Sequence, residues 1–139
     1  MIYLDTSAIL KLYIAEPEFE SVRRLAGTAS VTCTHLIAYA ETRAGLARAL
    51  RMKRVDAVGL AEVKRDFEQD WRRMLIVTPD ETGIRRAGEL AERLGLCCYD
   101  SVHLAAAERV ASQSGNLLFA CFDNELNKAA NAIGMQTLN

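Results

Sequence analysis

Four acidic residues stand in sequence contexts in which a carboxylate can do chemistry. Asp5 directly follows the apolar run at 2–4, and Asp123 directly follows the apolar run at 117–122. Glu41 lies within an apolar stretch, and Asp100 precedes another at 101–107. Hard oxygen ligands without a His or Cys partner favour Mg²⁺ or Mn²⁺ over zinc. Such ions neutralise phosphate oxygens and activate water, which are the requirements of phosphodiester hydrolysis.

Each of these acids also has a purely structural explanation. Asp5, Asp100 and Asp123 stand where a carboxylate can cap a helix by accepting hydrogen bonds from its first turn. Glu41 could be an outward-facing helical charge. Four carboxylates at one edge of a sheet are harder to explain, because each pair at about 4 Å repels by about 1 kcal/mol even in water-like dielectric. A cation between them removes that repulsion, so we expect one or two Mg²⁺ or Mn²⁺ ions, with Asp5 and Asp100 as direct ligands.

The elements that must position these acids are short apolar strands alternating with longer helices. Spacing near 3.6 residues predicts helices, and short apolar runs predict strands. The predicted helices cover 34–51, 55–74, 81–94, 101–112 and 123–133, and the predicted strands cover 1–4, 29–33, 75–77, 117–122 and 135–138. This alternation predicts an α/β fold with a mostly parallel sheet covered on both faces. In such sheets the ligand crevice lies beyond the carboxyl ends of the strands.

Length and composition restrict the class of protein. A chain of 139 residues argues for one domain spanning 1–139, and its balance of hydrophobic (50%) and charged (25%) residues is typical of a soluble globular protein. The formal charge of −1 gives no overall positive field for nucleic acid. No apolar run approaches the roughly 20 residues of a bilayer span, and the N-terminus lacks a basic region before its first acid. We therefore expect no membrane association and a cytoplasmic location.

Three further groups of residues carry weaker signals. The cysteines (Cys33, Cys97, Cys98 and Cys121) lack paired C-x-x-C units, so we expect them to be reduced and mostly buried. His103 shares a helix face with Asp100, and a packed or hydrogen-bonded role is favoured over general acid or RNA contact. Five basic residues without an intervening acid lie between 43 and 54: Arg43, Arg48, Arg51, Lys53 and Arg54. They form either a solvated helix end or a track for an RNA backbone leading to Glu41, with Lys11 and Arg43 nearest the metal.

Taken together, these residues resemble a known family. The opening Asp5-Thr6-Ser7-Ala8, the buried Glu41, the block at 99–107 and the closing Phe122-Asp123 follow the order and spacing of a PIN-domain ribonuclease, in particular the VapC toxin of type II toxin–antitoxin pairs. The resemblance implies a three-layer α/β/α sandwich, Mg²⁺- or Mn²⁺-dependent RNA cleavage, a homodimer and a small antitoxin that blocks the site. The family's acidic positions fall on Asp5, Glu41, Asp100 and Asp123, and its small hydroxyl after the first acid falls on Thr6 or Ser7.

The chain departs from the family pattern at one position. Many relatives carry Thr or Ser two residues before the last acid, where this chain has Cys121. A thiol is a poor hydrogen-bond donor, so we expect the orientation of Asp123 to depend on Asn124 or on backbone groups.

The expected function is metal-dependent endoribonuclease activity with water as the nucleophile. Such hydrolysis leaves a 5′-phosphate and a 3′-hydroxyl. Two other interpretations stay open: a non-catalytic RNA- or protein-binding module with an idle acidic pocket, and a metal phosphohydrolase acting on a small phosphate ester. Several residues could pack a dimer or receive an antitoxin helix, although core packing explains them equally well: Tyr13, Phe19, Gly45, Ala49 and Trp71.

Overall fold

The structure, a computed structural model, describes residues 1–15 and 17–138. In this part of the chain the strands are β1 (Ile2–Leu4), β2 (Thr32–His35), β3 (Leu75–Val77), β4 (Leu118–Ala120) and β5 (Gln136–Thr137). The helices are α1 (Thr6–Leu10), α2 (Phe19–Thr28), α3 (Ile37–Arg51), α4 (Ala57–Trp71), α5 (Glu81–Leu94), α6 (Cys98–Ser114) and α7 (Asn124–Ala132). None of these helices is both long enough and apolar enough to cross a membrane.

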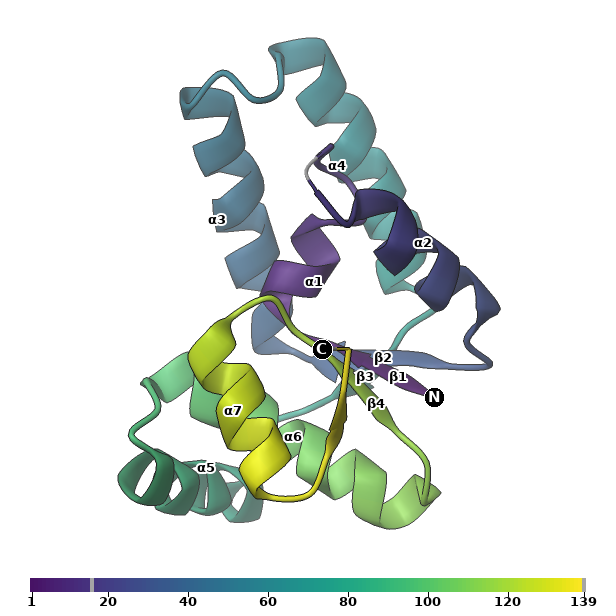
Figure 1. The fold of residues 1–139 in the computed structure, drawn as a ribbon. Coiled ribbons are helices and arrows are strands. Elements are labelled where there is room, and N and C mark those ends of the chain that lie inside the picture. Colours follow the sequence, from purple (N-terminus) through teal and green to yellow (C-terminus); the bar gives the residue numbers. More distant parts are fainter. Residues whose placement is uncertain (16, 139) are drawn as a thin grey trace.

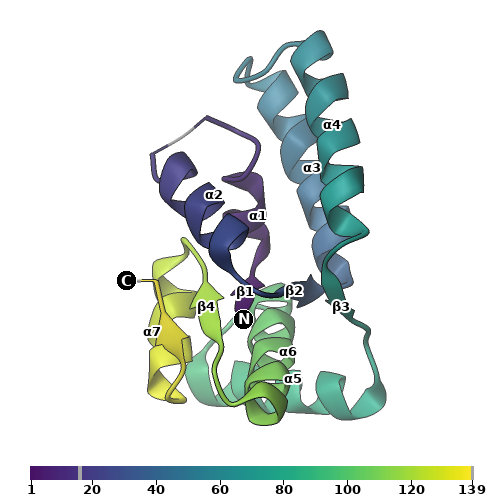
Figure 2. The same cartoon turned by 90° about the vertical axis from the view of Figure 1, so that its right-hand side faces the viewer.

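The strands form one sheet in the order β3-β2-β1-β4-β5, and every pairing in it is parallel. Helices α1 to α4 cover one face and α5 to α7 cover the other (Figures 1 and 2). The three-layer α/β/α sandwich is therefore confirmed, with a wholly parallel sheet. The chain changes direction across the sheet between β1 and β4, and a ligand crevice in a sheet of this kind lies outside the strand ends at such a point.

Alternation along β1 divides its side chains between two apolar cores. Tyr3 packs among residues of α5, α6 and α7, whereas Ile2 and Leu4 pack against α1, α3 and α4. The Tyr3 ring stacks on Phe119 of β4, with ring centroids 5.6 Å apart. Tyr3 therefore points into the helical layer that carries Asp100.

Some elements differ from the sequence predictions. The apolar pattern does not predict α1 or α2, because α1 has only five residues and Val22 is the buried residue of α2. Helix α6 begins at Cys98 rather than 101, with Cys97 as its N-cap. Asp100 therefore lies inside the first turn, and its interpretation as an N-cap is wrong.

The cysteines are only partly as predicted. All four are free thiols; Cys33 and Cys121 are buried, but Cys97 and Cys98 are exposed. The expectation of burial is wrong for this second pair because it lies where α6 begins, ahead of the buried stretch that starts at Ser101.

Candidate active site

Asp5 follows β1 and caps α1. Its Oδ1 accepts hydrogen bonds from the Ser7 hydroxyl at 2.7 Å and from the Ala8 backbone N–H at 2.9 Å. Its Oδ2 faces the thiol of Cys121 at 3.4 Å. The residue is only 6% exposed, and burial raises the pKa of Asp5 above its ordinary value even though its hydrogen bonds act in the opposite direction.

Glu41 projects from α3 and is held by two donors. Its Oε2 accepts from the Thr6 hydroxyl at 2.7 Å and lies 2.9 Å from Nε2 of His103. Partial burial raises the pKa of Glu41, but the hydrogen bonds from His103 and Thr6 lower it by more, so the pKa lies below its ordinary value. Glu41 is therefore not an outward-facing helical charge, since its side chain is 24% exposed and joins α3 to both α1 and α6.

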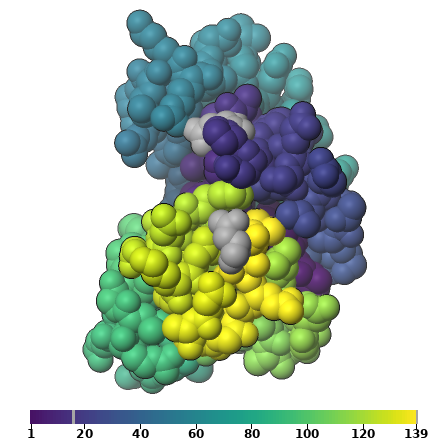
Figure 3. Space-filling model, viewed as in Figure 1, coloured from purple at the N-terminus to yellow at the C-terminus, as the bar shows by residue number. Residues whose placement is uncertain are grey.

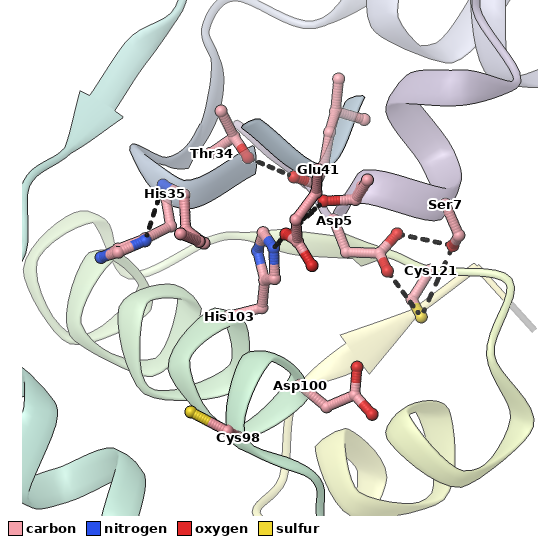
Figure 4. A network of polar contacts seen from close by, with 12 residues as sticks. Asp5, Ser7, Thr34, His35, Glu41, Cys98, Asp100, His103 and Cys121 are labelled. Atoms are coloured by element: carbon pink, nitrogen blue, oxygen red, sulfur yellow. Dashed lines mark hydrogen bonds and ion pairs between the residues drawn. The ribbon is translucent and has the colours of Figure 1, made fainter. Parts of the chain in front are cut away.

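Asp100 lies on the same face of α6 as His103, because residues three apart are neighbours on a helix surface. Its Oδ2 accepts a hydrogen bond from the thiol of Cys97 at 3.0 Å. Figure 4 shows Asp5, Glu41 and Asp100 around a common space at the carboxyl ends of the strands. Of the four acids predicted to gather there, these three come from the residue after β1, from α3 and from α6.

Asp123 follows β4 and caps α7, where its Oδ1 accepts from the Leu126 N–H at 2.9 Å. Backbone groups therefore orient this carboxylate, as expected from the cysteine at 121. The Cys121 sulfur accepts from the backbone N–H of Asp123 at 3.2 Å. The thiol of Cys121 is directed instead at the carboxylate of Asp5.

The two hydroxyl residues after Asp5 have separate roles. Thr6 donates to Glu41, as given above, and Ser7 donates to Asp5. The Ser7 oxygen also accepts the backbone N–H of Phe122 at 2.8 Å. Ser7 thus connects the end of β1 to the segment that follows β4.

The donor chemistry of the site fits a hard divalent cation. Its candidate ligands are carboxylates, the groups that Mg²⁺ and Mn²⁺ prefer. Asp5 is a buried carboxylate without an ion pair to Lys or Arg in the described ranges. Over the same residues, no three His, Cys, Asp or Glu side chains converge into a metal-holding group. Asp5 and Glu41 are hydrogen-bonded instead to hydroxyl, thiol and imidazole partners.

The predicted RNA-binding residues divide into two groups. Lys11 and Arg48 line a hollow of about 670 Å³ together with Ser7, Phe122 and Asn124. Figure 3 shows the molecule notched on this face, between the teal atoms of α3 and the yellow-green atoms that follow β4.

Arg43 and Arg51 are placed differently. Arg43 pairs with Glu68 of α4 at 3.1 Å and donates to the Tyr39 hydroxyl. The Arg43 side chain is therefore directed at α4 rather than at Asp5, Glu41 and Asp100. Arg51 is exposed at the end of α3 and does not line the hollow.

Sequence reasoning missed one residue of this network, Tyr3. Its hydroxyl lies 2.9 Å from Nδ1 of His103. The sequence does carry a signal, because Tyr3 is a phenol in an otherwise aliphatic strand that leads to the first acid. His103 is hydrogen-bonded and buried, as the favoured interpretation predicted.

Comparison with known proteins places this geometry in a family. The sequence model of the PIN-domain family matches residues 2–132 of this chain. The chain belongs to the PIN-domain family. This PIN domain is 33% identical over 134 residues to ribonuclease VapC45 of Mycobacterium tuberculosis (strain CDC 1551 / Oshkosh), an alignment that covers 96% of this chain and 92% of that protein. It is 30% identical over 138 residues to ribonuclease VapC46 of Mycobacterium tuberculosis (strain ATCC 25618 / H37Rv), with 99% and 95% covered.

Solved structures share the fold of this PIN domain. The FitAcB structure from Neisseria gonorrhoeae has a TM-score of 0.69 at 22% identity and covers 100% of this chain and 97% of its own. The structure of Mycobacterium tuberculosis VapC20, described as a sarcin–ricin loop cleaving toxin, has a TM-score of 0.67 at 17% identity, with 97% and 96% covered.

Proposed function

We propose that this PIN domain is a metal-dependent endoribonuclease that hydrolyses RNA phosphodiester bonds and acts as the toxin of a toxin–antitoxin pair. The observation that carries the proposal is the position of Asp5, Glu41 and Asp100 around one space at the carboxyl edge of the sheet (Figure 4). Relatives at about one-third identity over nearly the whole chain are named ribonucleases, which supports the same conclusion.

Four carboxylates would hold one or two Mg²⁺ or Mn²⁺ ions: Asp5, Glu41, Asp100 and Asp123. Such an ion neutralises phosphate oxygens and activates water for attack on phosphorus. Thr6 and Ser7 keep two of the carboxylates in place, because their hydroxyls donate to Glu41 and Asp5. Hydrolysis by water leaves a 5′-phosphate and a 3′-hydroxyl.

The RNA backbone would lie in the hollow between α1, α3 and the segment after β4. Arg48 lines this hollow beside Ser7, so its charge can attract phosphates close to Asp5. Lys11 lines the same hollow, but its ammonium group is paired with Glu18 at 3.0 Å. Arg51 extends the same positive face toward the end of α3. Arg43 contributes less, because its guanidinium is paired with Glu68.

Two protein partners belong to the proposal. A hollow of about 420 Å³ is lined by apolar groups that include Tyr13, Phe19 and Met74, and by two acidic and two basic side chains (Asp66, Asp70, Arg23 and Arg73). Its apolar lining is suited to an antitoxin helix with an apolar face. A second hollow of about 460 Å³ is lined by apolar groups that include Leu36, Ile84 and Tyr99. These three side chains are 44%, 48% and 53% exposed, and exposed apolar groups gathered in this way favour a homodimer through this face.

The decisive experiment compares wild type with Asp5→Asn on end-labelled structured RNAs in Mg²⁺, in Mn²⁺ and in EDTA. Asp56→Asn is the matched control, because Asp56 caps α4 through the N–H of Gly59 and does not belong to the site. We expect metal-dependent cleavage by wild type and Asp56→Asn, no cleavage by Asp5→Asn, and fragments with 5′-phosphate ends.

Four results would contradict the proposal. Cleavage that survives Asp5→Asn means a contaminant or a different site. Products with 2′,3′-cyclic phosphate mean that the ribose hydroxyl, not water, attacks. RNA binding without cleavage or metal binding identifies a non-catalytic module, and cleavage of small phosphate esters that short RNA does not inhibit identifies a phosphohydrolase.

A further inference from the structure

We propose that Tyr3 and His103 are positioning residues for Glu41, fixing its carboxylate so that one oxygen is held and the other is left for the cation. This role rests on the proposed function, because Glu41 is one of its proposed metal ligands. It starts from a continuous chain of polar contacts. Tyr3 Oη lies 2.9 Å from His103 Nδ1, and His103 Nε2 lies 2.9 Å from Glu41 Oε2.

The ionised Glu41 carboxylate only accepts hydrogen bonds, so it requires a hydrogen on Nε2 of His103, while the Tyr3 hydroxyl holds Nδ1. A neutral imidazole carries one N–H, and when the phenol donates to Nδ1 that hydrogen lies on Nε2. A protonated imidazole carries a hydrogen on both nitrogens and donates to the phenol oxygen instead. In either state Nε2 donates to Glu41, so the positioning does not depend on the charge of His103.

Burial makes this arrangement rigid. Tyr3 is 0% exposed and His103 is 2% exposed. Their rings pack edge to face with centroids 6.0 Å apart, and Tyr3 also stacks on Phe119. Tyr3 lies on β1, the central strand of the sheet. Its contact with His103 therefore anchors the imidazole to the middle of the sheet. A side chain fixed in this way loses little further entropy when it holds its partner.

The two oxygens of Glu41 have different surroundings. Oε2 receives both donors, the Thr6 hydroxyl and His103 Nε2. Oε1 has no hydrogen-bond partner among residues 1–15 and 17–138. Figure 4 shows this second oxygen on the side of the site where Asp5 and Asp100 lie. Tyr3 and His103 thus act through Glu41 and do not touch the ion or the RNA themselves.

The test measures Mn²⁺ affinity by calorimetry on the folded protein without RNA. His103→Leu removes the donor and keeps an apolar side chain, whereas His103→Gln keeps an N–H that can reach Glu41. Tyr3→Phe removes only the hydroxyl. Tyr39→Phe is the matched control, because the Tyr39 hydroxyl donates to Glu68 and not to the site. Circular dichroism establishes that each variant is folded.

We expect His103→Leu and Tyr3→Phe to weaken Mn²⁺ binding by about 10-fold or more, the usual effect of losing a group that orients a metal ligand. We also expect kcat for RNA cleavage to fall with KM nearly unchanged. His103→Gln should restore most of the affinity, and Tyr39→Phe should match wild type.

Other outcomes overturn the inference. Wild-type Mn²⁺ affinity in folded His103→Leu shows that the histidine only fills space. A His103→Gln variant as defective as His103→Leu shows that the imidazole itself is needed for something other than donating to Glu41. If wild type itself neither binds Mn²⁺ nor cleaves RNA, the proposed function fails and this inference fails with it.

Discussion

The thiol of Cys121 lies 3.4 Å from Oδ2 of Asp5, and its sulfur also accepts the backbone N–H of Asp123 at 3.2 Å. One buried sulfur therefore contacts the acids that follow both β1 and β4. Burial, together with the neighbouring Asp5 charge, raises the pKa of the Cys121 thiol. The group is a neutral, weak donor at neutral pH, and it stabilises the ionised form of Asp5 less than a hydroxyl would.

Replacing Cys121 with Ser should therefore lower the pKa of Asp5, because an O–H donates more strongly to a carboxylate. We expect the acid limb of the pH–rate profile for RNA cleavage to move to lower pH. Cys33→Ser is the control, since the Cys33 thiol is also buried but donates to the Ile2 carbonyl. A profile that stays in place, or moves equally in both variants, would contradict this role for Cys121.

Asp5→Asn should make the metal-free protein more stable while removing activity. Asparagine caps a helix about as well as aspartate and has no charge to desolvate. We expect a gain of about 1 kcal/mol at pH 7, or a few degrees in the thermal midpoint. Asp56→Asn, a cap outside the site, should show no gain. A midpoint for Asp5→Asn at or below that of Asp56→Asn would disprove the argument.

The pH dependence of that gain follows from the raised pKa of Asp5. The folded state binds this proton more tightly than the unfolded state, so the contribution of Asp5 to the unfolding free energy falls as pH rises from the ordinary carboxyl pKa through the folded pKa. The stability difference between Asp5→Asn and wild type should therefore shrink as the pH is lowered through this window. Adding Mn²⁺ at pH 7 should stabilise wild type and leave Asp5→Asn unchanged.

Arg48→Glu should weaken RNA binding and reduce its salt dependence. Removing one phosphate contact lowers the slope of log K against log[salt] by about 1. Arg51→Glu should have a smaller effect, because Arg51 does not line the hollow that Arg48 shares with Ser7. Arg85→Glu is the control in the other helical layer, where Arg85 pairs with Glu81. Fluorescence anisotropy over a range of KCl concentrations measures RNA binding. A slope of log K against log[salt] that is the same for Arg48→Glu and wild type would contradict an RNA path along this hollow.

Ile84→Glu should convert a dimer into monomers. Ile84 is 48% exposed and lines the apolar hollow beside Leu36 and Tyr99, where a charge cannot be buried without a large cost. Val58→Glu is a matched control, because Val58 is 70% exposed and does not line that hollow. Light scattering with size-exclusion chromatography gives the mass of each variant. A wild-type monomer, or a dimer that tolerates Ile84→Glu, would rule out this interface.

Local sequence patterns were sufficient to predict that Asp5, Glu41 and Asp100 face one space (Figure 4). Asp5 and Asp123 directly follow short apolar strands, and parallel strands bring their carboxyl ends to one edge. Glu41 stood out because its neighbours are apolar. The Tyr3–His103 contact was not predictable in the same way, since it joins residues 100 positions apart. It depends on which face of β1 meets α6, and a single sequence does not specify that pairing.

Two helices were missed or misplaced by the sequence patterns, because few of the residues concerned are buried. Helix α2 carries a short apolar stripe of Phe19, Val22 and Leu25, in which only Val22 is fully buried, so its signal is shorter than that of the predicted helices. The α6 helix begins before its apolar block, because Cys98 and Tyr99 occupy its first turn while exposed to solvent. Hydrophobic periodicity reflects which residues are buried, so a segment with few buried residues gives only a weak periodic signal.

The pairing of β1 has a consequence for the order in which the proposed site is assembled. Ile2 pairs with Leu118, which is synthesised much later than Ile2. Contacts between such distant parts of a chain form late in folding. A nascent chain without β4 and α7 lacks both Asp123 and the strand beside Asp5, so the proposed site is incomplete until these elements have been synthesised.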